Sequence, residues 1–215
     1  MNIVYYEDEY CFYVRKPAGI PTTYGKEKSF LEYLIDEDHY IIKVLKSEFD
    51  QEEEYGLLNR LDNATSWLLY FAKTKKIKDE YKKLQQEGFV KKFYLLEVYW
   101  DIQYWIRENG RCIDYPIAHH KYEKDRMVVI KTEQDKKKWE LRLHHLKTEI
   151  LESFWCEDRQ TTTLLVFIQK WIRHQIRSHF SSIGYPIVWD DIYWKKKDPQ
   201  KWDLQLFSVG LLVKK

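Results

Sequence analysis

The stretch LLNRLDNATSWLLYFA, residues 57–72, joins a polar loop to an apolar segment. Its second part, Leu68–Ala72, is a short continuous apolar run, which favours a buried strand. Its first part places Arg60 and Asp62 just before that strand. Taken alone, an aspartate in such a loop is most often a turn or capping residue. A chemical role for Asp62 must therefore rest on the rest of the chain.

The N-terminal part of the chain predicts a hairpin and two helices. Residues 3–16 read as two short strands separated by an acidic turn. Residues 29–46 carry apolar side chains at helical spacing, with Ser29 as the expected N-cap and an interruption near Asp38. Residues 74–86 predict an amphipathic helix with lysines on its outer face.

The C-terminal part predicts mainly antiparallel sheet. A strand is expected at 90–100, a helix at 173–183 and a final strand at 204–213. Between 104 and 169 lie four strand-like stretches, namely CIDYPIA, RMVVIKT, TEILESFW and TTTLLVFIQ. We therefore predict an α+β fold with a mixed, mostly antiparallel sheet and flanking helices, built as a single domain over residues 1–215.

Composition bounds the class of protein. The chain has 215 residues and 44% hydrophobic content, which suffices for a sizeable core. It contains no apolar run long enough to cross a membrane and no signal peptide, so we expect a cytoplasmic protein with no membrane partner. The three cysteines, Cys11, Cys112 and Cys156, are widely spaced and odd in number, which favours buried free thiols over disulfides.

The net charge of +2 does not by itself indicate a nucleic-acid partner. Its distribution is more informative, because acidic residues concentrate at 36–38 and 48–54. Lysines cluster elsewhere, at 73–78, 82–83, 91–92, 136–138 and 195–197. Such segregation permits a basic face on a nearly neutral protein.

Five segments occur in an order that changes the interpretation of Asp62. They are KPAGIPT (16–22), NRLDNATS (59–66), FAKT (71–74), VKKFYLLEV (90–98) and HQIRSHFSSIGYPIVWDDIYW (174–194). In order and spacing they resemble the RluA-type family of RNA pseudouridine synthases over nearly the whole chain. The resemblance implies that fold, and an enzyme that converts uridine to pseudouridine in ribosomal or transfer RNA.

The resemblance also assigns roles to individual residues. It maps the catalytic aspartate to Asp62, the active-site tyrosine to Tyr94 and the basic partner of the carboxylate to Arg177. It places Arg60 near the displaced nucleotide. We further expect RNA binding by Arg60 and by the residues Arg173, His174 and Gln175, and for His174 and Gln175 we expect a role in holding the loop structure in preference to one in the chemistry.

The residue types fit the chemistry. Pseudouridine formation breaks the bond between N1 and C1′ and rejoins the base through C5, so a carboxylate near C1′ is the natural participant. Asp62 could attack C1′ or assist an elimination, and both routes stay open. The guanidinium of Arg177 would keep the carboxylate ionised, and Tyr94 would stack on the base and transfer a proton.

Tryptophan stands at five positions where the family has glycine, namely Trp67, Trp100, Trp171, Trp189 and Trp194. An average glycine content of about 7% would give about 15 glycines, whereas this chain has 7 glycines and 9 tryptophans. We hypothesise that the gene comes from a lineage that reads UGA as glycine and that UGA was translated here as tryptophan. Genuine tryptophans at these turns would put the activity in doubt.

Two other classes of protein compete with this interpretation. One is a catalytically degenerate RNA-binding protein of the same fold. The other is a carboxylate hydrolase, which lacks a second acid in a matching motif. The histidine pairs at 119–120 and 144–145 lack metal-ligand spacing, so we expect no metal and no cofactor. We expect a monomer without an N-terminal RNA-binding appendage.

Overall fold

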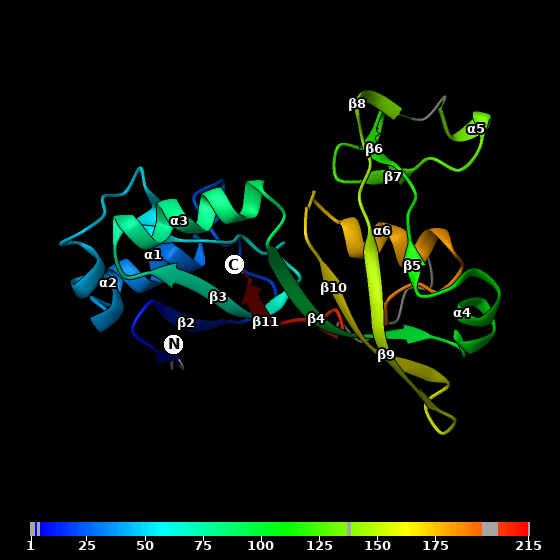
Figure 1. Ribbon diagram of the computed structural model, residues 1–215, viewed down its shortest axis with the longest axis horizontal. Coiled ribbons are helices and arrows are strands. Elements are labelled where there is room, and N and C mark those ends of the chain that lie inside the picture. The colour runs from blue at the N-terminus through cyan, green and yellow to red at the C-terminus, as the bar shows by residue number, and fades with distance from the viewer. Residues whose placement is uncertain (1–2, 4, 137–138, 195–201, 215) are drawn as a thin grey trace. The chain divides into compact units, whose positions relative to one another are not determined.

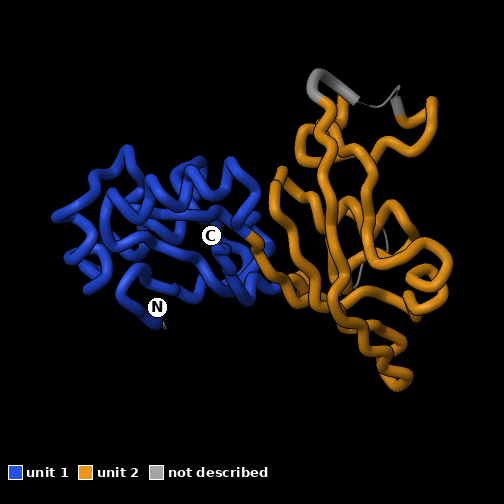
Figure 2. The backbone as a smooth tube through the Cα atoms, viewed as in Figure 1, with its two compact units in different colours: residues 1–90, 207–215 blue, residues 91–206 orange. Residues whose placement is uncertain are grey.

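A computed structural model describes residues 3, 5–136, 139–194 and 202–214. Its contacts divide the chain into two compact units, residues 1–90 with 207–215 and residues 91–206 (Figure 2). The sequence had not indicated this division, and the prediction of a single catalytic domain stays a prediction. The lysines at 137–138 and 195–197 lie outside the described residues.

The first unit contains four neighbouring strands in the order β1-β2-β3-β11 (Figure 1). Their bounds are Tyr5–Glu7, Cys11–Lys16, Ser66–Ala72 and Leu206–Val213. β2 pairs antiparallel with both β1 and β3, whereas β11 runs parallel to β3. The predicted hairpin and the strand after Asp62 are both present. The sheet therefore fixes the end of the Asp62 loop.

The helix predicted at 29–46 is two helices, α1 (Phe30–Asp36) and α2 (Tyr40–Leu45). Ser29 caps α1 as expected and forms a reciprocal capping box with Glu32. The break falls where Asp38 adopts a φ of +47°, which a right-handed helix does not permit. The predicted interruption near Asp38 is therefore confirmed.

Helix α3 (Lys75–Gln86) begins after the N-cap Thr74 and lies beside β3 (Figure 1). Its inner face buries Tyr81 and Leu84 against Val90. A short 3₁₀ helix, η1 (Glu54–Gly56), precedes the Asp62 loop. Gly56 has a φ of +81°, and a Cβ there would lie 2.7 Å from the carbonyl oxygen of Ala72, so only glycine fits.

The second unit is built on antiparallel strands in the order β4-β10-β9-β5. Their bounds are Val90–Tyr99, Thr161–Ile168, Thr148–Cys156 and Cys112–Ile113. A smaller sheet has the order β7-β6-β8, with bounds Met127–Val129, Ile117–His120 and Trp139–His144. The helices are α4 (Gln103–Asn109), α5 (Glu133–Lys136) and α6 (Gln175–Ser182).

Together the elements confirm the predicted α+β class with a mostly antiparallel sheet. Helix α4 was not predicted, because its segment was assigned to a region of strands. Its termini carry recognisable signals, since Asp101 accepts a hydrogen bond from the amide of Gln103 and Gly110 ends the helix at a φ of +79°. Among the described helices, none is long and apolar enough to cross a membrane.

Candidate active site

The loop that carries Asp62 is held by the KPAGIPT segment of the same unit. The hydroxyl of Thr22 donates to the carbonyl of Leu61 at 2.8 Å and accepts from its amide at 3.0 Å. The amide of Gly19 donates to the carbonyl of Asn63 at 2.8 Å. These bonds fasten the residues on both sides of Asp62, whose own side chain is half-buried. The position of the carboxylate is thus set by two segments about 40 residues apart.

Lys16 supplies a buried cation beside this carboxylate. Its side chain is fully buried, and its ammonium donates to the carbonyls of Pro17, Ile20 and Asn63 at 2.8, 2.7 and 3.2 Å. Burial lowers the pKa of Lys16 to about 8, and the charge of Asp62 acts in the opposite direction. Electrostatic interactions are mutual, so the ammonium also favours an ionised Asp62.

Arg60 is exposed and forms an ion pair with Glu54. Glu54 opens a run of three residues with positive φ, at +52° for Glu54, +49° for Tyr55 and +81° for Gly56. Non-glycine residues seldom adopt this conformation. The strained turn therefore presents the Glu54 carboxylate to Arg60.

Tyr94 lies on β4, opposite Val166 of β10. Its side chain is buried. Residues alternate between the two faces of a strand, so Lys92, Tyr94 and Leu96 share the buried face of β4. Tyr94 is therefore placed by a regular antiparallel ladder instead of a loop.

Arg177 is held by a buried bidentate ion pair. Its Nε and Nη2 donate to the two carboxylate oxygens of Asp190 at 2.9 and 2.7 Å, and both side chains are almost completely inaccessible. Asp191 accepts a further bond from Nη2 at 3.1 Å. The carboxylate of Asp190 also accepts the amides of Ile192 and Tyr193. The guanidinium is thus rigidly positioned by groups that the sequence interpretation had not singled out.

The three neighbours of Arg177 predicted to bind RNA differ in accessibility. Arg173 is exposed, and its guanidinium pairs with Asp125 at 3.3 Å. His174 and Gln175 are buried, and the amide of Gln175 donates to the carbonyl of Lys147 at 2.9 Å. A direct RNA contact stays a prediction for all three, and burial favours a positioning role for the latter two.

His174 has a left-handed backbone, with a φ of +55°, just before α6. Its Nδ1 lies 3.2 Å from the hydroxyl of Tyr193 and its Nε2 lies 3.5 Å from Nη1 of Arg177. Burial, helped by the charges of Arg177 and Arg173, lowers the pKa of His174 to about 3. The imidazole is therefore neutral and serves as a hydrogen-bonding spacer beside Arg177.

Three of the five tryptophans at glycine positions of the family have left-handed backbones. The φ angles are +81° at Trp67, +67° at Trp100 and +59° at Trp189. Trp67 is the second residue of β3, close after Asp62, and packs on Phe207. For a bulky side chain such φ values are outliers, whereas glycine adopts them freely. The backbone at these three positions is thus of the kind that glycine favours.

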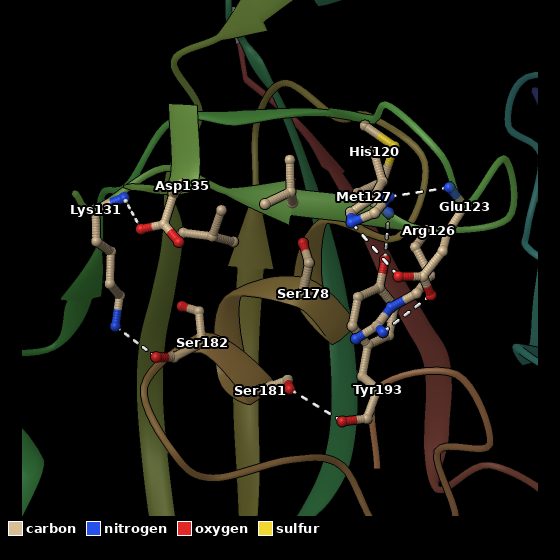
Figure 3. Close-up of a pocket in the computed structure, with 12 residues that line it drawn as sticks. His120, Glu123, Arg126, Met127, Lys131, Asp135, Ser178, Ser181, Ser182 and Tyr193 are labelled. Carbon is tan, nitrogen blue, oxygen red and sulfur yellow. Dashed lines mark hydrogen bonds and ion pairs between the residues drawn. The ribbon is translucent and has the colours of Figure 1, made fainter. Parts of the chain in front are cut away.

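Helix α6 and β7 line a cavity of about 400 Å³ (Figure 3). Its basic side chains are already engaged, since Lys131 donates to the carbonyl of Ser182 and Arg126 pairs with Glu123. The acidic side chains of Glu123 and Asp135 also line it. The cavity is therefore polar but of mixed charge. Three serines of α6 face it: Ser178, Ser181 and Ser182.

A family model described as RNA pseudouridylate synthase matches residues 10–182. The chain belongs to the RNA pseudouridylate synthase family. The match spans the Lys16 segment, the Asp62 loop, β4 and α6, so it contains each of the predicted catalytic residues. The family resemblance stated from the sequence is confirmed.

Curated relatives of the family cover most of this chain. An RNA pseudouridine synthase of Aquifex aeolicus is 30% identical over 90% of the chain and 56% of its own length. The ribosomal large subunit pseudouridine synthase D of Nitrosomonas europaea is 27% identical over 88% of the chain and 49% of its own length. The chain thus spans about half the length of these relatives.

A solved structure confirms the pseudouridylate synthase fold. The human RNA pseudouridylate synthase domain containing 1 superposes with a TM-score of 0.72 at 19% identity, over 98% of this chain and 78% of that one. At this identity the likeness concerns the fold alone.

Sequence reasoning on this chain missed Lys16 and Asp190. Both lie inside quoted segments, KPAGIPT and PIVWDDIYW, and an Asp-Asp pair shortly after the HQIR helix was a usable signal for Asp190. Asp62 belongs to one unit, and Tyr94 and Arg177 belong to the other. Their convergence stays a prediction. No cluster of three or more metal-ligating side chains occurs among the described residues.

Proposed function

We propose that this protein isomerises uridine to pseudouridine in structured RNA, ribosomal or transfer, and that Asp62 is its catalytic carboxylate. Membership of the family supports the reaction class. The name of the Nitrosomonas relative supports ribosomal RNA as one substrate to test.

The electrostatic interaction of Asp62 with the buried Lys16 carries the proposal. An aspartate that merely terminates a turn needs no buried cation beside it. Here the ammonium is taken out of water and is bonded to three carbonyls, one of them that of Asn63, the residue after Asp62. Burying a charge is unfavourable unless it is compensated. The arrangement therefore favours a preorganised, ionised carboxylate, as expected at a catalytic site.

In the proposed reaction the bond between N1 and C1′ breaks, and its electron pair stays on the uracil. The base turns while bound, and a bond forms between C5 and C1′. The proton on C5 is then lost and N1 gains one, so no atom enters or leaves overall. Asp62 would either bond to C1′ in between or take a proton in an elimination, and both routes remain open.

Tyr94 and Arg177 complete the proposed catalytic set. Tyr94 would stack against the base and carry its phenol to the proton-transfer step. Arg177 would add a second cation for Asp62, and its bidentate pair with Asp190 would fix the guanidinium in the required direction. A rigid cation stabilises developing charge without having to reorganise.

Arg60 and Arg173 are the proposed RNA-contacting residues. A uridine within stacked RNA must leave the stack before its C1′ can react, and a long side chain can occupy the vacated space. Arg60 is exposed next to Asp62 and would fill this role. It would have to exchange Glu54 for the RNA, so Glu54 would restrain it in the free protein.

The test is an Asp62→Asn variant incubated with total RNA, with pseudouridine counted by mass spectrometry and RNA affinity measured in parallel. The proposal predicts loss of modification with retained binding. Asp79→Asn is the matched control, because Asp79 is an exposed aspartate on α3 of the same unit. Equal modification by wild type and Asp62→Asn would end the assignment of the nucleophile.

The alternative is a catalytically degenerate RNA-binding protein, which predicts RNA binding by the wild type with no pseudouridine in either sample. The left-handed tryptophans near the site favour testing it. A monomeric state and a cytoplasmic location stay predictions, which gel filtration and cell fractionation would check.

A further inference from the structure

Lys92 is a buried lysine on β4 whose ammonium lacks the compensation that other buried lysines have. Lys16 donates to three carbonyls and Lys78 donates to the carbonyl of Glu53. Lys92 as a whole is only 4% exposed, and among the described residues none accepts a hydrogen bond from its ammonium, which is not one of the fully buried unpartnered atoms. The ammonium lies over the ring of Trp171, whose centroid is 5.3 Å from Nζ.

Such an arrangement is unfavourable for folding. A buried polar group is normally bonded, and a buried charge is normally paired. Burial alone lowers the pKa of Lys92 to about 8, and no carboxylate opposes the change. The group therefore still carries a proton at neutral pH, at a cost in stability that a methionine would avoid. Buried groups with strongly shifted pKa values cluster at functional sites.

The position of Lys92 indicates what the missing acceptor is. Lys92 and Tyr94 are two residues apart on the buried face of β4, opposite Ile168 and Val166 of β10. The side chain that covers the ammonium, Trp171, is itself 44% exposed and follows the end of β10 by three residues. The stem of Lys92 is therefore buried while its ammonium keeps contact with solvent, on the face of the proposed base-contacting tyrosine.

We infer that Lys92 contacts the substrate, and that its ammonium binds an oxygen anion of the target nucleotide on the Tyr94 face of β4. This inference rests on the proposed function. The oxygen belongs either to a uracil carbonyl, which becomes negatively charged during the reaction, or to the adjacent phosphate. When the bond between N1 and C1′ breaks, negative charge spreads onto the uracil oxygens, and a fixed cation there stabilises the detached base. When C5 bonds to C1′, the electron pair of the uracil anion forms the new bond and the negative charge on the uracil is lost.

The experiment compares wild type with Lys92→Met, Lys92→Arg, Lys92→Gln and Lys91→Met. Lys91 is the matched control, because it is the preceding lysine on the opposite face and lies over the ring of Phe167. For each protein kcat, KM, RNA affinity and Tm are measured on the same RNA. We expect Lys92→Met to lower kcat/KM about 100-fold, Lys92→Arg to recover part of it, and Lys91→Met to stay near wild type.

The two sources of the anion give different kinetics. Loss in kcat with an unchanged KM identifies a uracil oxygen. A raised KM, weaker binding and a salt dependence shallower by about one charge identify a phosphate. Stability separates a substrate contact from a structural role, because Lys92→Met should melt at or above the wild-type temperature, whereas loss of a structural lysine lowers Tm.

Three outcomes overturn the inference about Lys92. The first is wild-type kcat/KM in Lys92→Met. The second is a Tm of Lys92→Met well below wild type, with Lys92→Gln equally unstable. The third applies when the wild type makes no pseudouridine, so that the proposed function fails. If Lys92→Met then binds RNA as tightly as the wild type, the inference that Lys92 contacts RNA fails as well. If Lys92→Met binds RNA more weakly, Lys92 is still a phosphate-binding residue.

Discussion

The left-handed tryptophans give a prediction that separates backbone strain from packing. At Trp100, where φ is +67°, replacement by glycine and by alanine removes the same indole, which is 43% exposed and packs on Trp194. The loss of packing energy is therefore the same in both variants, and it cancels when their free energies of unfolding are compared. Alanine keeps the Cβ that disfavours this φ, and glycine does not. Trp171 is the control, because it is 44% exposed and is not among the residues with positive φ.

The expected magnitudes follow from the φ values. A left-handed conformation costs an L-residue roughly 1–2 kcal/mol, and glycine loses about 0.4–1 kcal/mol through the entropy of the unfolded chain. Trp100→Gly should therefore be more stable than Trp100→Ala by about 0.5–1 kcal/mol. At Trp171 the order should reverse, with alanine favoured by about 0.4–1 kcal/mol.

Urea unfolding of the four variants, with Tm as a second measurement, tests this sign inversion. For a chain of this length 1 kcal/mol corresponds to about 2–4 °C in Tm. Trp67 and Trp189 should behave as Trp100 does, because their φ values are +81° and +59°. Alanine variants that match or exceed the glycine variants at all three positions would refute the strain argument. Independently, UGG codons at these positions would exclude the recoding hypothesis.

Three further predictions concern the ion pair, the buried lysines and the thiols. Asp190→Asn should destabilise the protein by about 3–5 kcal/mol in urea unfolding, because it strands a buried guanidinium, whereas Asp191→Asn, at a carboxylate 81% exposed, should change stability by less than about 1 kcal/mol. Equal losses would contradict the buried-pair argument. Burial lowers the pKa of Lys16 and of Lys92 from 10.5 to about 8, so between these values the unfolded chain binds more protons and the lysine contribution to stability rises with pH. The difference in Tm between Lys92→Met and wild type should therefore shrink from pH 8 to pH 10, and a constant difference would rule this out. Finally, Arg159 lowers the pKa of the Cys156 thiol and burial raises that of Cys11 to about 12, so iodoacetamide should label Cys156 first and Cys11 only on unfolding, as peptide mass spectrometry would reveal.

Local signals in the sequence were sufficient for most elements. The cap at Ser29, the break near Asp38 and the amphipathic pattern before Gly88 each depend on side chains within a few residues, and the structure reproduces all three. The thiol prediction was only partly right, because all three cysteines are free but only Cys11 is buried. Helix α4 was missed because aromatic residues such as Tyr104 and Trp105 also favour strands.

The contacts that build the site could not be read from local patterns. Lys16 meets the carbonyl of Asn63 across 47 residues, and no periodicity encodes that distance. Arg177 was expected to serve Asp62, and its strongest described partner is Asp190, a residue 13 positions later in an irregular segment. Burial of Lys92 follows from its place on β4, yet its lack of an acceptor depends on every neighbouring element.

The placement of β11 bears on how this protein is made. This strand lies parallel to β3, and the hydroxyl of Ser208 donates to the carbonyl of Leu68 just beyond the Asp62 loop. All of residues 91–206 are synthesised between these two strands. A nascent chain on the ribosome therefore holds β3 with one neighbour missing until residue 208 has emerged. The strand that anchors the Asp62 loop gains this partner only after residues 91–206 have been made, so chains stopped before residue 208 should bear an unfinished site.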